Sequence, residues 1–68
     1  MEREAVSSSN VLSIGYDPGS ETLEVEYRTG VYQYLNVPLF MWERLKSADS
    51  IGRFLNAEIK NFYPCVKL

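Results

Sequence analysis

Apolar and polar side chains alternate along most of the stretch from residue 23 to residue 37. One alternating run covers residues 23–28, a second is centred on Gln33, and a Thr29-Gly30 pair lies between them. A period of two is typical of a strand with one buried face, and a short turn that contains glycine joins antiparallel neighbours. The pattern therefore predicts a β-hairpin around which the rest of the chain is arranged.

A further strand is predicted just before this hairpin. Residues 11–16 also alternate, and the run at 17–21 contains Asp, Pro, Gly and Ser, which together form a strong turn signal. The chain then returns along residues 22–28. These elements predict a three-stranded antiparallel meander.

The lengths of the two predicted turns determine which residues pair. A loop at residues 18–21 places Tyr16 opposite Leu23, and a loop at residues 29–30 places Val25 opposite Tyr34. Both registers bring the same apolar and aromatic side chains to one face: Leu12, Ile14, Tyr16, Leu23, Val25, Tyr27, Tyr32 and Tyr34. The other face, which stays open, holds Ser13, Glu24, Glu26, Arg28 and Gln33.

Tyr32 and Tyr34 are therefore predicted to be structural residues that lie under a covering layer, with their hydroxyl groups at the edge of the core. The alternative is that both rings are stacking platforms for unpaired bases. The acidic residues Glu24 and Glu26 on the open face argue against an RNA strand laid along that face.

The remaining chain predicts two short helices that cover the apolar face. The first begins near Pro38 and repeats Met41, Trp42, Leu45 and Ala48 at helical spacing. The second is capped by Asp49 or Ser50 and runs to about residue 61. The predicted fold class is α+β, with a β-β-β-α-α order and both helices packed on one face of the sheet.

Length and charge limit the organisation further. With 68 residues the chain has room for a single domain, 1–68, in which residues 1–6 and 65–68 are expected to be loose termini. The net charge is −2, with the acidic residues concentrated before residue 37 and the basic residues after it. An anionic partner is therefore expected to meet the second half.

Several function classes are disfavoured by what the sequence lacks. No apolar run is long enough to span a membrane and the chain opens with charged residues, so a cytoplasmic protein without a membrane partner is expected. The single cysteine, Cys65, cannot form an internal disulfide. Because the chain has no histidine, no metal site, no cofactor and no enzymatic activity are expected.

A set of short motifs runs through almost the whole chain. They are Ser8-Ser9-Asn10, Ile14-Gly15-Tyr16-Asp17, residues 23–27, Tyr32-Gln33-Tyr34, Val37-Pro38, residues 50–56, Ile59-Lys60 and Tyr63-Pro64. Together they resemble the KTSC domain, a family named for its occurrence at the C-terminus of some lysyl-tRNA synthetases and also found as small bacterial and phage proteins. The resemblance implies a domain of unknown function for which RNA binding has been proposed. The chain differs from that pattern at Leu39, Phe40 and Ile51, where such relatives carry polar or charged residues.

The best polar constellation lies on the second predicted helix. Arg53, Asn56 and Lys60 recur three and four residues apart, which aligns them on one side of that helix. Two cations and an amide suit a phosphate or a carboxylate. The leading hypothesis is therefore a non-enzymatic binding module that engages RNA or an RNA-binding protein through these residues.

Three other interpretations remain open. The first gives Arg53 and Asn56 a structural role, either on a solvated helix face or in a network with Tyr32 or Tyr34 and the loop at 8–10, and we favour it over binding. A small anionic ligand is a second option, held between Arg53 and the hydroxyls of Ser8 and Ser9. Third, Leu39 and Phe40, together with Val31 and Leu35 on the open sheet face, are candidates for an interface with another protein or with a second copy in a homo-oligomer.

Overall fold

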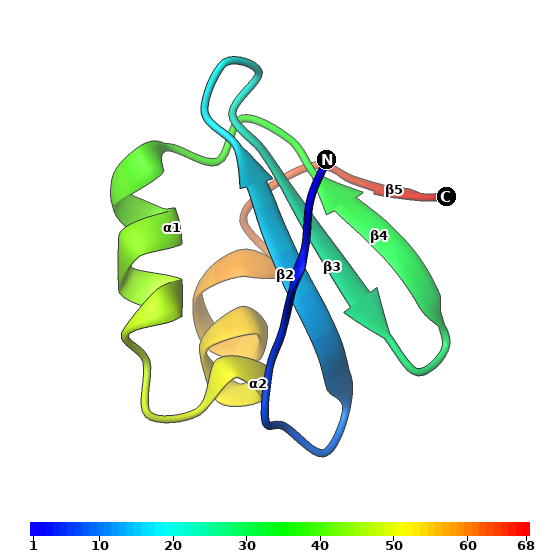
Figure 1. Ribbon diagram of the computed structural model, residues 1–68. Helices are drawn as coiled ribbons and strands as arrows, with labels where there is room; N and C mark the ends of the chain where they lie inside the picture. The colour runs from blue at the N-terminus through cyan, green and yellow to red at the C-terminus, as the bar shows by residue number, and fades with distance from the viewer.

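The computed structural model describes residues 1–68, which form one antiparallel sheet with a helical layer on one face (Figure 1). The strands are β1 (Glu4–Ala5), β2 (Val11–Asp17), β3 (Thr22–Tyr27), β4 (Gly30–Tyr34) and β5 (Cys65–Lys67), and they lie side by side in that order. The helices are α1 (Leu39–Lys46) and α2 (Ile51–Phe54), the latter continued by a π-helical turn, η1 (Leu55–Ile59). Neither helical segment is long and apolar enough to span a membrane.

The α+β class, the antiparallel sheet and the two helices are confirmed, but the predicted number of strands was wrong. The sheet has five strands because both ends of the chain, predicted to be loose, add short strands at its edges. β1 pairs with β2, and β5 pairs with β4. Each new strand has only two or three residues, too few to show an alternating pattern in the sequence.

The register of the central hairpin differs from the prediction by two residues. Tyr34 lies opposite Leu23, Tyr32 opposite Val25, and Gly30 opposite Tyr27. Gly30 has a φ of 143°, a backbone conformation that glycine adopts readily and other residues rarely do. It can therefore close the turn and also serve as the first residue of β4. Because the shift is an even number of residues, the side chains of β3 and β4 keep their predicted faces. Arg28 does not stay on the open face as predicted, because β3 ends at Tyr27 and Arg28 lies in the turn.

A β-bulge near the start of β2 places a different residue in the core from the one predicted. The pairs Tyr16 with Leu23 and Ile14 with Val25 form as predicted, but the register shifts between Val11 and Ser13. As a result Val11, not Leu12, pairs with Tyr27 and enters the core with 1% of its surface exposed, and Leu12 is only half-buried.

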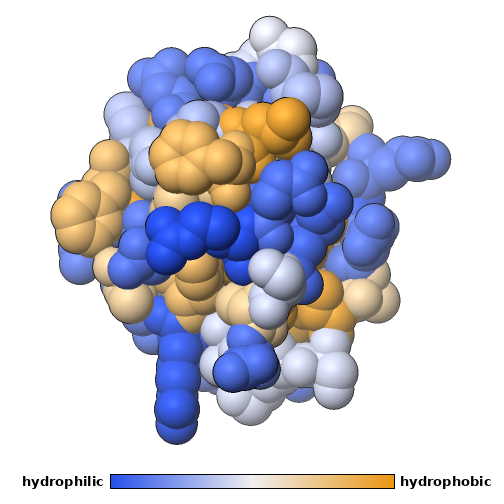
Figure 2. All heavy atoms as spheres, turned by 90° about the vertical axis from the view of Figure 1, so that its left-hand side faces the viewer, coloured by the Kyte–Doolittle hydropathy of each residue, from blue (hydrophilic) through white to orange (hydrophobic).

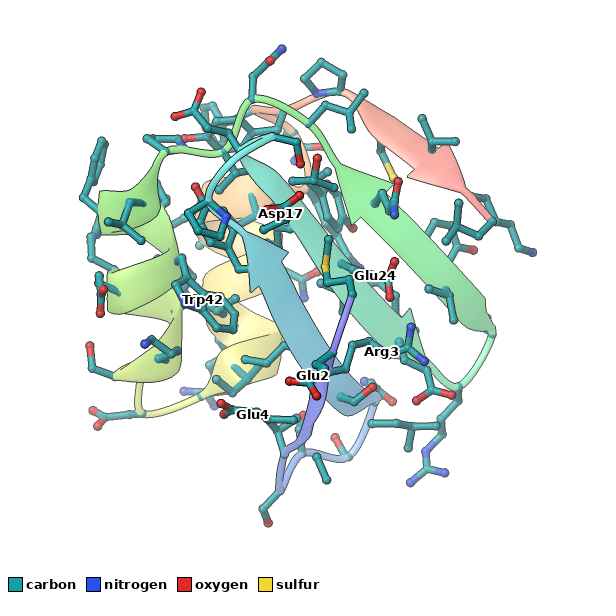
Figure 3. The ribbon with its side chains drawn as sticks, turned by 45° about the horizontal axis from the view of Figure 1, so that its top comes forward. Glu2, Arg3, Glu4, Asp17, Glu24 and Trp42 are labelled. Atoms are coloured by element: carbon teal, nitrogen blue, oxygen red, sulfur yellow. The ribbon has the colours of Figure 1, made fainter.

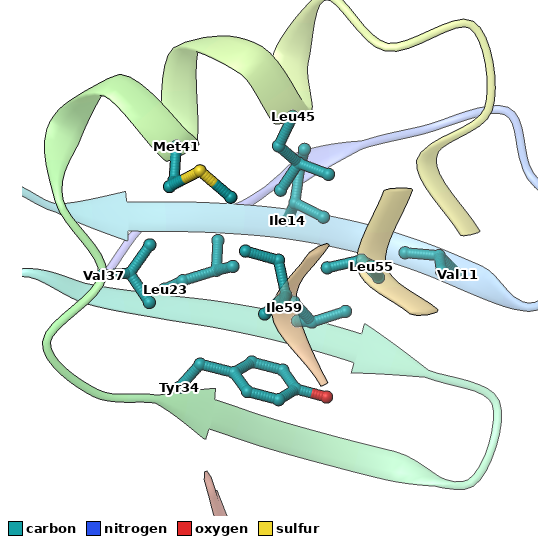
Figure 4. Close-up of a cluster of buried hydrophobic side chains, with 10 residues drawn as sticks. Val11, Ile14, Leu23, Tyr34, Val37, Met41, Leu45, Leu55 and Ile59 are labelled. Atoms are coloured by element: carbon teal, nitrogen blue, oxygen red, sulfur yellow. The ribbon is translucent and has the colours of Figure 1, made fainter. Parts of the chain in front are cut away.

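The core lies between the sheet and the helical layer, and Figure 4 shows the two sides meeting. α1 contributes Met41 and Leu45, and η1 contributes Leu55 and Ile59. The sheet and the segment that follows β4 supply the rest: Val11, Ile14, Leu23, Val25, Tyr34 and Val37. At the edge of this core, Trp42 of α1 stacks on Tyr16 of β2 with ring centroids 5.5 Å apart.

Candidate functional site

The hollow best suited to a ligand lies where β3, β4 and β5 approach the end of η1. It has a volume of about 550 Å³. Its lining consists of Tyr27, Tyr32 and Tyr34, the basic residues Arg28 and Lys60, and four uncharged residues that include Cys65. No acidic side chain lines this tyrosine hollow, although the protein as a whole is negatively charged.

The three tyrosines form a connected aromatic wall. The Tyr27 and Tyr32 rings meet edge to face, with centroids 5.4 Å apart and an interplanar angle of 74°. The Oη atoms of Tyr27 and Tyr34 lie 2.9 Å apart and share a hydrogen bond. Tyr34 is buried and Tyr32 is half-buried, so both face the helical layer as predicted, and the Tyr34 hydroxyl finds its partner at the edge of the core.

The paired phenols are neutral at physiological pH, and burial strengthens their preference for the neutral form. Burial raises the pKa of Tyr27 and of Tyr34 above the usual value for a phenol, and the pKa of Tyr27 is raised further because its hydroxyl donates its proton to the Tyr34 hydroxyl. A phenolate in the hollow would repel an anion. The neutral pair presents hydrogen-bonding groups instead, without adding negative charge.

Two lysines lie over the exposed sides of the rings. The Lys60 Nζ is 5.0 Å from the centre of the Tyr27 ring, and the Lys67 Nζ is 5.7 Å from the centre of the Tyr32 ring. Both lysines are exposed. A cation over an exposed ring gains only about 0.5–1 kcal/mol, so either ammonium group can move to another partner at low cost.

The π-helical turn positions Lys60. The Lys60 backbone N–H donates to the Leu55 carbonyl at 2.8 Å, a hydrogen bond that spans one residue more than in an α-helix. The wider turn changes the direction of every side chain that follows, and such turns occur often at functional sites. Lys60 therefore reaches the sheet instead of continuing the line of Arg53 and Asn56.

The structure thus separates the predicted polar constellation. Arg53 lines a different, smaller hollow together with Arg44 and Glu58, and Asn56 lines neither hollow. Only Lys60 belongs to the tyrosine hollow.

The two serines predicted to bind an anion with Arg53 also lie outside the tyrosine hollow. Ser8 lies against the start of α2, where a Cβ on Gly52 would be 3.7 Å from the Ser8 Oγ. The Ser9 carbonyl accepts a hydrogen bond of 2.8 Å from Arg28 Nε. Neither serine lines a hollow with Lys60 or Arg53.

The sequence analysis missed Arg28 and Lys67 as site residues. Lys67 reaches Tyr32 because the two residues pair across β4 and β5. The only sequence signal for that pairing is the three-residue alternation at 65–67, which is too short to be informative by itself.

The predicted apolar interface is split between two sides of the molecule. Leu39 and Phe40 form the first turn of α1 and are 51% and 61% exposed. Figure 2 shows apolar side chains on this helical side, interrupted by hydrophilic ones. Val31 and Leu35 alternate with the inward-facing tyrosines and so lie on the opposite face of the sheet, where they are half-buried.

The fold and the motifs place this chain in a known class of small domains. The sequence model of the KTSC domain matches residues 7–63, and the chain belongs to the KTSC domain family.

Individual relatives agree with this assignment. An uncharacterized protein from Stutzerimonas stutzeri is 44% identical over 61 residues, which cover 88% of this chain and 86% of the relative. A crystal structure of a KTSC domain protein from Yersinia pestis superposes with a TM-score of 0.96 at 47% identity and covers 98% of this chain and 96% of that one. A lysine–tRNA ligase from a Nostoc strain is 39% identical over 46 residues, which are 66% of this chain but only 8% of the ligase.

Proposed function

We propose that this protein is a small, non-enzymatic binding domain that holds single-stranded RNA at the tyrosine hollow, and that it acts in the cytoplasm. The observation that carries the proposal is a hollow lined by three tyrosines and two basic residues with no acidic group, beside which a further lysine, Lys67, lies over the Tyr32 ring.

The geometry suits a nucleotide unit. When a base arrives, the Lys60 and Lys67 ammonium groups, which are exposed and weakly held, move from the rings to the phosphates. The faces of Tyr27 and Tyr32 then become available for stacking, which contributes about 1–3 kcal/mol per base. Arg28 adds a third cation at the same hollow. The acidic open face lies on the other side of the sheet and does not oppose the RNA.

The family comparison supports an RNA partner. One relative is a lysine–tRNA ligase, and part of that protein resembles this chain. Three basic residues neutralise few phosphates, so the proposed binding is modest in affinity and sensitive to salt.

The proposal is tested by titrating fluorescently labelled single-stranded RNA of about ten nucleotides and following fluorescence anisotropy. Lys60→Glu is expected to weaken binding about tenfold or more, because a phosphate contact becomes a repulsion. For the wild-type protein, the logarithm of the association constant is expected to fall with the logarithm of salt concentration with a slope of about −2.

Arg53→Glu is the matched control, since it makes the same charge change on the same helical segment but outside the tyrosine hollow. It is expected to retain binding within about twofold, a difference of less than 0.5 kcal/mol. Equal losses in the two variants would move the site away from the hollow, and an affinity unaffected by salt would contradict the RNA proposal itself.

A second candidate function is association with another copy or another protein through Leu39 and Phe40. Two large, exposed apolar side chains in the first turn of α1 favour it. Burial of a phenylalanine contributes about 1.5–3 kcal/mol, which is useful to so small a domain.

Light scattering tests the homo-oligomer. The expected mass exceeds the 7.8 kDa of one chain, and Phe40→Glu is expected to return it to that value. Phe62→Glu changes an aromatic residue that is 68% exposed at a different place and should leave the mass unaltered. A single-chain mass at every concentration would exclude self-association.

A further inference from the structure

The open sheet face carries a polar cluster made by Ser13, Glu24, Glu26 and Gln33. No helix covers this face, yet Glu24 is only 6% exposed. One oxygen of its carboxylate accepts a hydrogen bond of 2.9 Å from Gln33 Nε2, and the other pairs with the guanidinium group of Arg3 (Figure 3). We refer to these four residues as the open-face cluster.

The cluster is arranged to receive an arginine. Arg3 Nε donates to Ser13 Oγ at 3.0 Å, and the Ser13 hydroxyl donates its own proton to Glu26 at 2.9 Å. The serine lone pair is thus directed at the guanidinium group, and Gln33 orients the Glu24 carboxylate. A guanidinium group donates in several fixed directions, so two oriented acceptors select it over the single ammonium group of lysine.

Charge reinforces this preference. The hydrogen bond from Gln33 and the pairing with Arg3 lower the pKa of Glu24, so the carboxylate stays ionised at neutral pH. An ionised carboxylate is stabilised by a cationic hydrogen-bond donor against it, which favours an occupied cluster over an empty one.

The present occupant is held by few other contacts. Residues 1–5, the N-terminal arm, are all exposed, and β1 contributes only the pairs Glu4 with Ile14 and Ala5 with Ser13. The arm crosses β2 at Gly15, where a Cβ would overlap the carbonyl oxygen of Glu2. The sequence model of the family begins at residue 7, after Arg3, although the superposition on the Yersinia pestis structure covers 98% of this chain and so extends into the arm.

We infer that the open-face cluster is an arginine-binding site for an extended segment of a partner protein, and that Arg3 occupies it within the chain until such a segment replaces the arm. The partner's segment takes the place of β1 beside β2 and puts its arginine between Ser13 and Glu24. The acidic pair Glu24 and Glu26 complements a basic segment. The site is independent of the tyrosine hollow, which lies on the other face.

The test uses the full chain with Arg3→Ala and an acetylated, amidated peptide of sequence Met-Glu-Arg-Glu-Ala, followed by NMR of the backbone amides of β2 and the side-chain amide of Gln33. The variant is expected to bind the peptide about tenfold more tightly than the wild type, in which Arg3 competes. A peptide with lysine in place of arginine is expected to bind about tenfold more weakly. The double variant Arg3→Ala, Glu24→Gln is expected to lose the interaction.

Any one of three results would overturn the inference. The wild type and Arg3→Ala could bind the peptide equally well, the arginine and lysine peptides could bind equally well, or binding could survive Glu24→Gln. Arg3→Lys provides the same comparison if the alanine variant does not fold, because it keeps the charge and the side-chain stem. Self-association of the wild type that disappears in Arg3→Ala would assign the site to the arm of a second copy and would also overturn the proposed partner.

Discussion

Leu55→Ala is expected to lower the free energy of unfolding by about 2–5 kcal/mol. Leu55 is fully buried in η1, where it belongs to the core cluster between the sheet and the helical layer. The truncation removes apolar contact and leaves a cavity that the rigid sheet cannot fill. A chain of 68 residues has a total stability of about 3–10 kcal/mol, so the substitution removes a large share of it and should lower the urea midpoint clearly. Urea denaturation followed by circular dichroism measures the change.

Leu39→Ala is the matched control because it deletes the same atoms from a side chain that is 51% exposed. Its effect is expected to stay within about 0.5 kcal/mol. Comparable losses in a protein of single-chain mass would contradict the core described above, whereas comparable losses in an oligomer would place Leu39 in the interface between copies.

The central layer of the fold could be predicted because its signals are local and repeated. Ile14, Leu23 and Val25 alternate with polar neighbours, and a hairpin register that was wrong by two residues still left each of them on the buried face. An even error is harmless to a period of two. The bulge was not predictable by the same reasoning, because Val11 and Leu12 are both apolar and only the pairing with Tyr27 selects Val11 for the core.

The candidate site could be predicted less completely because it depends on contacts between distant parts of the chain. Lys60 was identified from its helical spacing, but its partner Tyr27 is 33 positions earlier and was expected only to pack in the core. Lys67 depends on β5, an edge strand that forms because β4 offers it unpaired backbone groups. Neither the contact between Lys60 and Tyr27 nor the pairing of β5 with β4 leaves a local pattern in the sequence.

The surroundings of Glu24, on the open face of the sheet, also depend on a contact between distant parts of the chain and could not be predicted. The alternating pattern correctly placed Glu24 on the face of the sheet away from the tyrosines, where no helix covers it. A charged residue on an uncovered face is normally solvated. Glu24 is instead nearly buried, because the N-terminal arm crosses the sheet and brings Arg3 to it. The arm can approach so closely only because position 15 has no side chain, as the Cβ overlap with Glu2 shows.

Gly15→Ala is therefore expected to displace the arm and to lower the free energy of unfolding by about 2–3 kcal/mol. The new Cβ would occupy the space of the Glu2 carbonyl, which is backbone and cannot rotate away as a flexible side chain would. Lifting the arm breaks the pairing of Arg3 with Glu24, removes the cover over the carboxylate and leaves Gln33 as its remaining partner. Thermal or urea unfolding measures the loss, and faster hydrogen exchange in β1 locates it.

Gly19→Ala separates this effect from the general cost of replacing a glycine. A Cβ at position 19 would lie 3.4 Å from an Asp17 side-chain oxygen, an ordinary contact, so the change should cost less than about 0.5 kcal/mol. In an Arg3→Ala background the pairing with Glu24 is already lost, and Gly15→Ala should then cost about 1 kcal/mol less than it does in the wild type. Full additivity of the two substitutions would mean that the arm and the Glu24 carboxylate are not coupled, and the glycine would then act on the sheet alone.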